Sequence, residues 1–373
     1  MNLLEKFFKL STPIEIIEAI ATYDFRAEYI QEEYPKTREC IQKGCEKTCE
    51  AKGVEFHSDL LLSDDPIDKY VAYKVLTNVK KGFDADNSLG TCRLMGEVYR
   101  KLWAATVKYS NFMAIKSFVN EDEKIVLFGG DVYNSLQTSI GLSKCECIRL
   151  YVKEPAKLKQ ILANLQDVMK VSHVLGNFGL VPAYYNAYRG TNRGKIRETN
   201  EAIEDYLDRS LIELQNNGFN SLDELIKYSN NSEKTSDLEK FTNEKKSQYT
   251  DFVPEDYNKY INMMFLWDMH VSETQVRNIS SSIKTWNEVT SAFIKRRSLF
   301  MAMMLYFACE RGEVYMEMLE RIIDAKSILS YESVFVLLGD VEGLTESDLS
   351  ILEEIKEKIL EIKIDSDKEG NRE

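Results

Sequence analysis

Apolar residues recur every three or four positions through much of the chain, and this period is typical of amphipathic helices. The segments that follow it most clearly are Ile14–Tyr29, Cys92–Phe118, Lys157–Lys170, Thr199–Gln215 and Glu346–Lys363. Thr12 and Pro13 precede the first segment and predict a helix N-cap and first turn. The apolar run Ser298–Cys309 is about half of the roughly 20 residues that a membrane-spanning helix needs, so we predict a buried helix.

Strand signals are few and lie close together in the sequence. Lys124–Phe128, Glu146–Val152 and Phe178–Val181 are short apolar runs of the kind that form strands. The chain contains only 17 Gly and 6 Pro, which leaves few turns for an all-β sandwich or barrel. We therefore predict a mainly α, multi-helix protein with one small β-containing element near residues 124–195.

Shifts in composition divide the chain into four predicted regions. These are an N-terminal helical region at 1–120, a small α+β element at 121–230, a polar loop or linker at 231–250, and a C-terminal helical region at 251–373. The linker prediction rests on Tyr228–Thr250, which is nearly devoid of aliphatic residues. Ile364–Glu373 is interpreted as an acidic tail.

The charge balance narrows the class of partner. The chain has 48 Lys and Arg against 61 Asp and Glu, a net charge of −13, which excludes a basic coat over the whole surface but not a local basic site. Met1–Leu10 mixes charged with apolar residues and lacks the uninterrupted apolar core of a signal peptide. The seven cysteines, an odd number, favour reduced thiols. We expect a cytoplasmic protein that does not enter a membrane.

One short segment carries most of the chemical information. Four basic residues lie within nine positions of this otherwise acidic chain, namely Arg189, Arg193, Lys195 and Arg197. Gly190 and Gly194 lie between them, where the main chain could approach a ligand closely. A basic, glycine-spaced loop that leads into a helix suits phosphate, because main-chain N–H groups and guanidinium groups can converge there. The alternative is a solvated loop whose arginines pair with the nearby Glu198, Glu201 and Glu204.

The residues just before this loop form a recognisable string. The sequence HVLGNFGLVP begins at His173 and includes Gly176 and Asn177, and it is followed by Asn186 and by Arg189-Gly190. The string resembles a segment of an uncharacterised bacterial domain-of-unknown-function family with a His-x-x-Gly-Asn…Asn-x-x-Arg-Gly element. It is also distantly similar to the HNH-type nuclease module of Gmr-like modification-dependent restriction enzymes.

The resemblance implies a set of roles for these residues. An HNH site uses a histidine base to activate water, an asparagine to orient it, and one divalent metal. The resemblance therefore implies catalytic roles for His173, Asn177 and Asn186, with Mg²⁺ or Mn²⁺ as cofactor. The chain departs from the nuclease pattern upstream. Where the family has a Glu-His-Ile signature, the nearest match is Glu146-Cys147-Ile148, so the implied HNH-like ββα module is interpreted as degenerate.

Two further groups of residues are candidates for a site. Cys40, Cys45 and Cys49 could join Cys145 and Cys147 in a zinc site, but their spacing is irregular, and we interpret them as ordinary cysteines. Lys295-Arg296-Arg297 forms a second basic island, which either flanks a phosphate path or covers solvent-facing turns.

Three functions remain as hypotheses. The first is a phosphate- or nucleic-acid-binding protein with a degenerate HNH-like module, placed in bacterial phage defence by its resemblance to restriction enzymes. The second is an active metal-dependent nuclease, which would need His173 and Asn177. The third is a helical scaffold without catalysis that binds a protein partner or forms a homo-oligomer.

Overall fold

The computed structural model describes several ranges of the chain, and the fold is given for these alone. They are residues 3–25, 93–103, 107–109, 117–120, 126–132, 144–163, 166–182, 261–267 and 283–362, with short pieces between 43 and 65. Within this part of the chain every helix is too short or too polar to cross a membrane.

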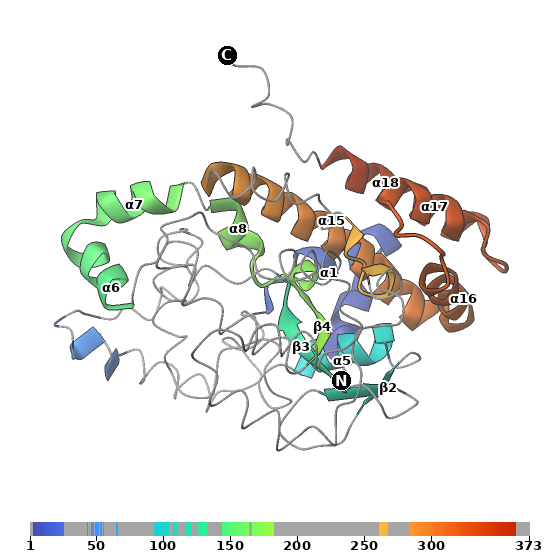
Figure 1. Ribbon diagram of the computed structural model, residues 1–373, viewed down its shortest axis with the longest axis horizontal. Coiled ribbons are helices and arrows are strands. Elements are labelled where there is room, and N and C mark those ends of the chain that lie inside the picture. The colour runs from blue at the N-terminus through green and yellow to red at the C-terminus, as the bar shows by residue number, and fades with distance from the viewer. Residues whose placement is uncertain are drawn as a thin grey trace, which may run out of the picture.

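Helices dominate the described residues (Figure 1). They are the 3₁₀ helices η1 (Leu3–Lys9) and η3 (Leu175–Asn177) and the α-helices α1 (Pro13–Thr22), α5 (Arg93–Trp103), α6 (Lys144–Lys153), α7 (Pro155–Ala163), α8 (Gln166–Val171), α15 (Ile283–Glu310), α16 (Gly312–Ile323), α17 (Tyr331–Gly339) and α18 (Glu346–Glu361). The strands are β1 (Val107–Tyr109), β2 (Ser117–Asn120), β3 (Val126–Asp131) and β4 (Phe178–Pro182). The prediction of a mainly α protein is confirmed.

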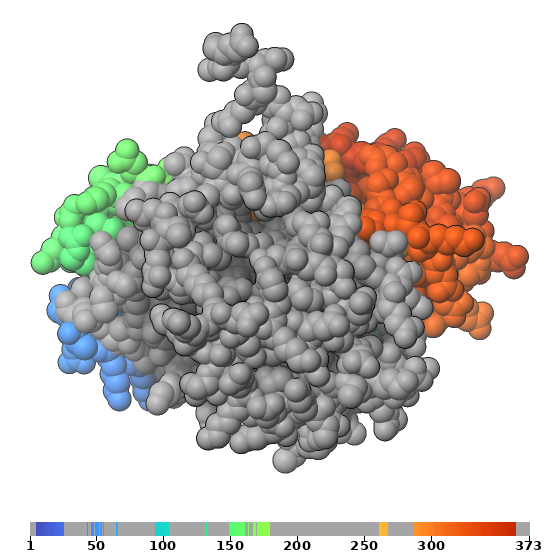
Figure 2. Space-filling model, in the orientation of Figure 1, coloured from blue at the N-terminus to red at the C-terminus, as the bar shows by residue number. Residues whose placement is uncertain are grey.

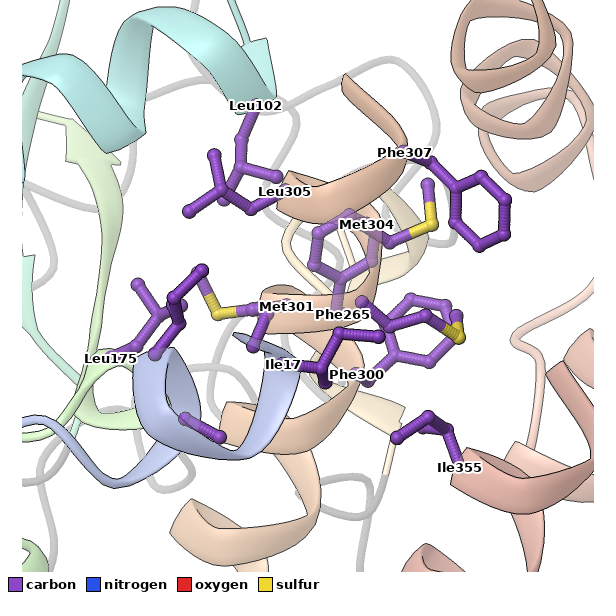
Figure 3. Close-up of a cluster of buried hydrophobic side chains, with 14 of the residues drawn as sticks. Ile17, Leu102, Leu175, Phe265, Phe300, Met301, Met304, Leu305, Phe307 and Ile355 are labelled. Carbon is purple, nitrogen blue, oxygen red and sulfur yellow. The ribbon is translucent and has the colours of Figure 1, made fainter. Parts of the chain in front are cut away.

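Helix α15 is the centre of the core. It packs against α1, α5, α8, α16, α18 and η3, and its residues from 300 to 305 are fully buried. Figure 3 shows Met301 and Leu305 of α15 lying between Leu102 of α5 and Ile17 of α1. A helix that is apolar on every side is stable only when other elements surround it. The predicted buried helix at 298–309 is therefore confirmed as part of α15.

The strands form one antiparallel sheet in the order β1-β2-β3-β4. β3 pairs with β4 so that Asp131 lies opposite Phe178 and Leu127 lies opposite Pro182. Two of the three predicted strands are confirmed, since 124–128 overlaps β3 and 178–181 lies within β4. The topology does not by itself identify an HNH-like ββα element.

The third predicted strand, 146–152, is wrong because these residues belong to α6. Leu150 is 1% exposed, whereas Val152 is 48% exposed. Two residues apart on a strand would share one face, but on a helix they point in nearly opposite directions. The apolar run therefore has a helical pattern, which its β-favouring composition obscured.

The predicted helix at 92–118 is too long. Leu94, Val98 and Leu102 are buried as expected, but α5 ends at Trp103 and the chain enters β1 at Val107. Val107 and Tyr109 favour strands, and pairing with β2 supplies their main-chain hydrogen bonds. The predicted helix at 157–170 is likewise divided, into α7 and α8.

Helix α1 begins as predicted and ends early. The Thr12 side chain accepts from the Glu15 N–H, and Glu15 accepts from the Thr12 N–H, which completes a capping box before Pro13. The helix ends at Thr22 rather than Tyr29. Tyr23 is extended, and its ring packs edge-on against Phe7 and Phe25, so tertiary packing ends the helix. The predicted C-terminal helix is confirmed as α18.

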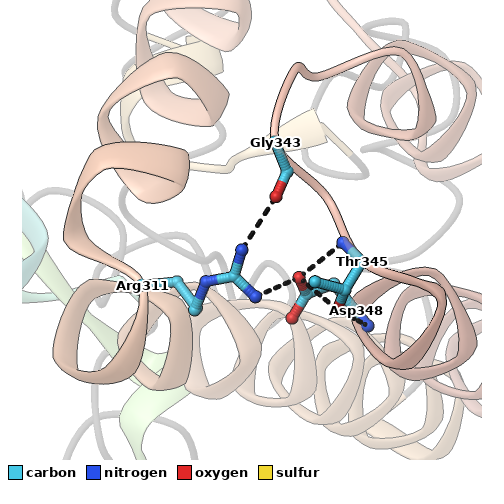
Figure 4. A network of polar contacts seen from close by, with 4 residues as sticks. All are labelled: Arg311, Gly343, Thr345 and Asp348. Carbon is cyan, nitrogen blue, oxygen red and sulfur yellow. Dashed lines mark hydrogen bonds and ion pairs between the residues drawn. The ribbon is translucent and has the colours of Figure 1, made fainter.

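A polar network joins the C-terminal helices (Figure 4). Arg311 precedes α16, and its guanidinium donates to the Asp348 carboxylate and to the Gly343 carbonyl, the latter at 2.8 Å. Asp348 also accepts from the Thr345 N–H and hydroxyl, both at 2.8 Å, at the start of α18. The Asp348 carboxylate therefore completes the capping box of Thr345 at the start of α18, and Arg311 joins it to the turn at Gly343.

The α6–α7 pair lies at one edge of the molecule. In Figure 2 it stands out at the left margin (green), on the side opposite the C-terminal helices (orange and red). The predicted helix at 199–215 and the predicted linker at 231–250 lie outside the described residues, and the four-region division stays a prediction.

Candidate functional site

The recognisable string folds into a tight turn against α15. Residues 172–177 connect α8 to β4, and η3 packs directly on α15. The Gly176 N–H donates to the Ser298 hydroxyl at 2.7 Å. A Cβ atom at Gly176 would lie 2.1 Å from the Ile294 carbonyl oxygen and 2.6 Å from the Ser298 nitrogen. Only glycine allows this approach, so Gly176 is explained by packing.

His173 lies inside this turn. Its residue is 6% exposed, its Nδ1 is 3.0 Å from the Ser172 hydroxyl, and its ring meets the Phe178 ring edge-on. The His173 carbonyl accepts from the Phe25 N–H at 3.0 Å. These contacts tie the segment after α1 to the turn.

Asn177 is also used within the fold. It is 1% exposed, and its side-chain nitrogen donates to the Ser172 carbonyl at 2.7 Å. Its own carbonyl accepts from the Val132 N–H at 2.7 Å, which joins the turn to the end of β3. The side-chain amide therefore closes the turn, and the main-chain carbonyl of Asn177 fixes that turn to the end of β3.

A buried arginine fixes the turn from the other side. Arg297 of α15 is 0% exposed. Its Nη1 donates to the carbonyls of Gly176 and Phe178, at 2.6 and 2.7 Å. Its Nε and Nη2 both donate to the Met264 carbonyl, at 3.0 and 2.9 Å. One guanidinium thus connects η3, β4 and the 261–267 segment, a group of contacts that we call the Arg297 clamp.

The 261–267 segment has its own polar anchor. The side-chain oxygen of Asn262 accepts from the Trp267 indole and from the Leu329 N–H, both at 3.0 Å. The side-chain nitrogen of Asn262 donates to the Ser327 main-chain carbonyl at 2.9 Å. Phe265 has a φ of 54° and is fully buried. A left-handed aromatic residue is strained, and the clamp at Met264 together with the Asn262 bonds holds it in place.

The predicted basic island at 295–297 has three separate environments. Lys295 is exposed, Arg296 is half-buried and donates from Nε to the Ile362 carbonyl at 2.7 Å, and Arg297 forms the clamp. Successive residues on a helix point about 100° apart, so three adjacent cations do not make one surface. Arg296 instead binds the carbonyl at the C-terminal end of α18.

A cleft of about 1310 Å³ lies beside the turn. Val171, Val174 and Leu299 contribute to its apolar lining, and Lys170 and Lys295 stand among its polar residues. Lys170 lies in the last turn of α8, where a cation interacts favourably with the helix dipole whether or not a ligand is bound. The cleft therefore does not identify a ligand.

The remaining candidates fall largely outside the described residues. These are Asn186, Arg189, Arg193, Lys195 and Arg197, together with Cys40 and Cys45. Cys49 is buried, and among the described residues no cluster of His, Cys, Asp and Glu could hold a metal ion. The structure thus brings His173 and Asn177 together but describes neither the basic loop nor Asn186.

Titratable groups with raised pKa values lie away from the turn. Burial raises the pKa of the Cys309 thiol and of the Tyr315 hydroxyl. The Tyr315 hydroxyl donates to the Leu102 carbonyl, so it joins α16 to α5. These groups are part of the helix packing.

Sequence reasoning missed the Arg297 clamp and Asn262. Arg297 follows Lys295 and Arg296 directly, so the available signal was only the apolar sequence on either side of this basic island, since a cation in a buried helix needs hydrogen-bond partners. No such signal marked the carbonyls of Gly176, Phe178 and Met264 as those partners. No family model, curated protein or solved structure matches this chain significantly.

Proposed function

We propose that this chain is a non-catalytic protein that binds phosphate-bearing ligands, nucleic acid first, and that its HNH-like element is degenerate. The observation that carries the proposal is the use of His173 and Asn177 inside the fold. A general base must reach the water it activates, and a side chain that is 6% exposed and packed on Phe178 is poorly placed to do so.

The binding half of the proposal rests on the basic loop. Arg189, Arg193, Lys195 and Arg197 follow β4 closely in the sequence. The clamp bonds at Gly176 and Phe178 fix the start of that strand, and a fixed strand is a suitable base for a binding loop. In this proposal HVLGNF serves as the support and the basic loop binds phosphate.

The decisive experiment measures binding and cleavage on the same protein. Fluorescence anisotropy with a labelled 20-base-pair DNA duplex and a 20-nucleotide RNA, at several salt concentrations, gives affinity and salt dependence. We expect the wild-type affinity to fall steeply as the salt concentration rises. The Arg189→Ala/Arg193→Ala variant should bind at least tenfold more weakly than the wild type. The matched control Lys101→Ala/Lys326→Ala removes the same charge from exposed positions elsewhere.

Cleavage separates this proposal from the nuclease alternative. The wild type with Mg²⁺ or Mn²⁺ should leave both substrates intact, as should His173→Gln. Metal-dependent cleavage that disappears in a folded His173→Gln protein would establish an HNH-type nuclease instead. Absence of nucleic-acid binding would favour the scaffold hypothesis, and co-purification would then be used to find the partner.

A role in bacterial phage defence extends the proposal through the resemblance to restriction enzymes. Expression of the wild type in a phage-sensitive host should lower plaque formation, and Arg189→Ala/Arg193→Ala should restore it. Equal protection by the two proteins would separate defence from phosphate binding. A cytoplasmic location belongs to the same proposal and is tested by cell fractionation.

A further inference from the structure

Helices α6 and α7 meet at a fixed corner. Glu154 is the single residue between them. Its N–H donates to the Leu150 carbonyl at 2.8 Å, and its own carbonyl accepts from the N–H groups of Lys157 and Leu158, at 3.0 and 3.1 Å. Pro155 follows at the first position of α7, where its fixed φ suits a helix start. The angle between the two helices is therefore set by main-chain bonds.

Burial separates the two sides of the corner. Leu150 and Leu158 are 1% and 0% exposed, so they anchor the helices inward. Arg149, Lys153 and Lys157 are exposed. Arg149 and Lys153 are four residues apart on α6 and share a face of that helix. We call these three residues the basic corner.

One carboxylate lies between two of the cations. Glu154 is 2.6 Å from Arg149 and 3.6 Å from Lys157, which places the Arg149 and Lys157 side chains near each other. The hydrogen bond from Arg149 and the charge of Lys157 lower the pKa of Glu154. This is the result expected where the local potential is positive.

The charge at this corner runs against that of the whole chain. Residues 149–159 contain four basic residues, Lys159 included, and one acidic residue, whereas the chain carries −13. An exposed positive area on an acidic protein attracts polyanions selectively, because the rest of the surface repels them. Polyanion binding is thus the association that this charge pattern favours.

We propose that the basic corner is a contact surface for the sugar-phosphate backbone of nucleic acid. This inference rests on the proposed function and adds a second contact site to the basic loop. Two of its three cations are lysines, which bind phosphate as point charges, and a contact to phosphate carries no sequence information. The contact is therefore independent of sequence, and it positions the nucleic acid on the protein.

The test uses the full chain and glutamine substitutions. Arg149→Gln/Lys153→Gln/Lys157→Gln removes the charges and keeps good helix formers. The control Lys101→Gln/Lys326→Gln/Lys356→Gln changes the net charge equally at α5, at the segment before α17 and at α18. Anisotropy with the DNA duplex and the RNA is measured from 50 to 300 mM salt, and circular dichroism verifies the fold of both variants.

We expect the corner variant to bind the duplex at least tenfold more weakly at low salt. The slope of log affinity against log salt should fall by about 3, roughly one for each lost phosphate contact. The control should retain the wild-type slope. A smaller slope change on single-stranded RNA fits its lower charge density.

The outcomes distinguish this inference from the function on which it rests. If the corner variant binds like the wild type while Arg189→Ala/Arg193→Ala does not bind, the basic corner is not a contact surface and the proposed function stands. If the control variant loses as much affinity as the corner variant, binding depends only on net charge, and the proposed contact at the basic corner is again contradicted. If the wild type binds neither nucleic acid, both proposals fail.

Discussion

Two arginines of this protein have opposite surroundings. Arg297 in α15 is 0% exposed and donates four hydrogen bonds to three main-chain carbonyls. The Arg149 side chain in α6 is 44% exposed and forms an ion pair with Glu154. A basic residue of this chain therefore has an internal role where its helix face is packed against other elements and an external role where that face is exposed. Arg297 follows Lys295 and Arg296 directly in the sequence, yet it alone of the three is buried.

The largest effect should come from the Arg297 clamp. Arg297→Met fills a similar volume but removes the guanidinium. The buried carbonyls of Gly176, Phe178 and Met264 then lose the donor of their hydrogen bonds. We expect a loss of about 3–5 kcal/mol in the free energy of unfolding, the usual cost of breaking a buried charged network from one side. Urea denaturation followed by circular dichroism measures it.

The same substitution at the exposed Arg149 tests whether burial causes the difference in stability. Arg149→Met should leave the free energy of unfolding nearly unchanged, because exposed ion pairs contribute little to stability. Similar losses at the two sites would mean that burial does not separate them. Arg297→Lys adds a further check, since an ammonium group cannot reproduce the bonds of a planar guanidinium.

The next effect concerns the turn that the clamp holds. Gly176→Ala places a methyl group against the backbone of α15, with both Ile294 and Ser298 closer than a carbon atom tolerates. We expect a loss of about 2–4 kcal/mol through displacement of η3. Gly312→Ala is the matched control, since a Cβ there meets nothing within 4 Å. An unaltered melting temperature in Gly176→Ala would show that η3 can move away from α15 at no cost.

Local patterns predicted the helices well and their ends poorly. The capping box at Thr12 and the core face of α18 follow from short-range spacing, and both are present. The end of α1 depends on the contacts of Tyr23 with Phe7 and Phe25, which no local pattern encodes. The end of α5 also depends on a contact that no local pattern encodes, because the next element, β1, pairs with β2.

The candidate site was predictable as a string but not as a geometry. His173, Gly176 and Asn177 were selected because they stand together in a recognisable order. The role of Gly176 depends on Arg297 and Ser298, more than 100 positions away along the chain, and His173 and Asn177 bind the main chain of Phe25 and Val132. A buried turn and a catalytic turn can share the same residue types, and only the surrounding burial distinguishes them.

An intermediate effect is expected where a charged pair is partly buried. The Arg311 side chain is 31% exposed and its partner Asp348 is 7% exposed. Asp348→Ala removes both the partner of Arg311 and the cap of α18, and we expect a loss of about 2 kcal/mol. Asp348→Asn keeps an acceptor for the Thr345 bonds, so its free energy of unfolding should fall by about half as much. Thermal unfolding of the three proteins tests this order, and equal losses would mean that the charge alone matters.

The smallest effect concerns a partly exposed carboxylate and depends on pH. Glu317 of α16 accepts from the Glu342 N–H at 3.2 Å and from Arg321 at 2.7 Å. These bonds lower the pKa of Glu317 from its ordinary value of 4.5. The unfolded chain therefore takes up this proton more readily than the folded protein, so the stabilisation is present above pH 4.5 and disappears as the pH falls through the lower, folded value.

Glu317→Gln should consequently be less stable than the wild type at pH 7, and this difference should shrink as the pH falls from 4.5 towards 3. Urea midpoints measured at half-unit steps between these values follow the difference. Glu320→Gln, at an exposed position on the same helix, controls for the loss of one negative charge. A difference that stays constant from pH 7 to pH 3 would assign the role of Glu317 to packing, and the bonds from Glu342 and Arg321 would then not depend on its charge.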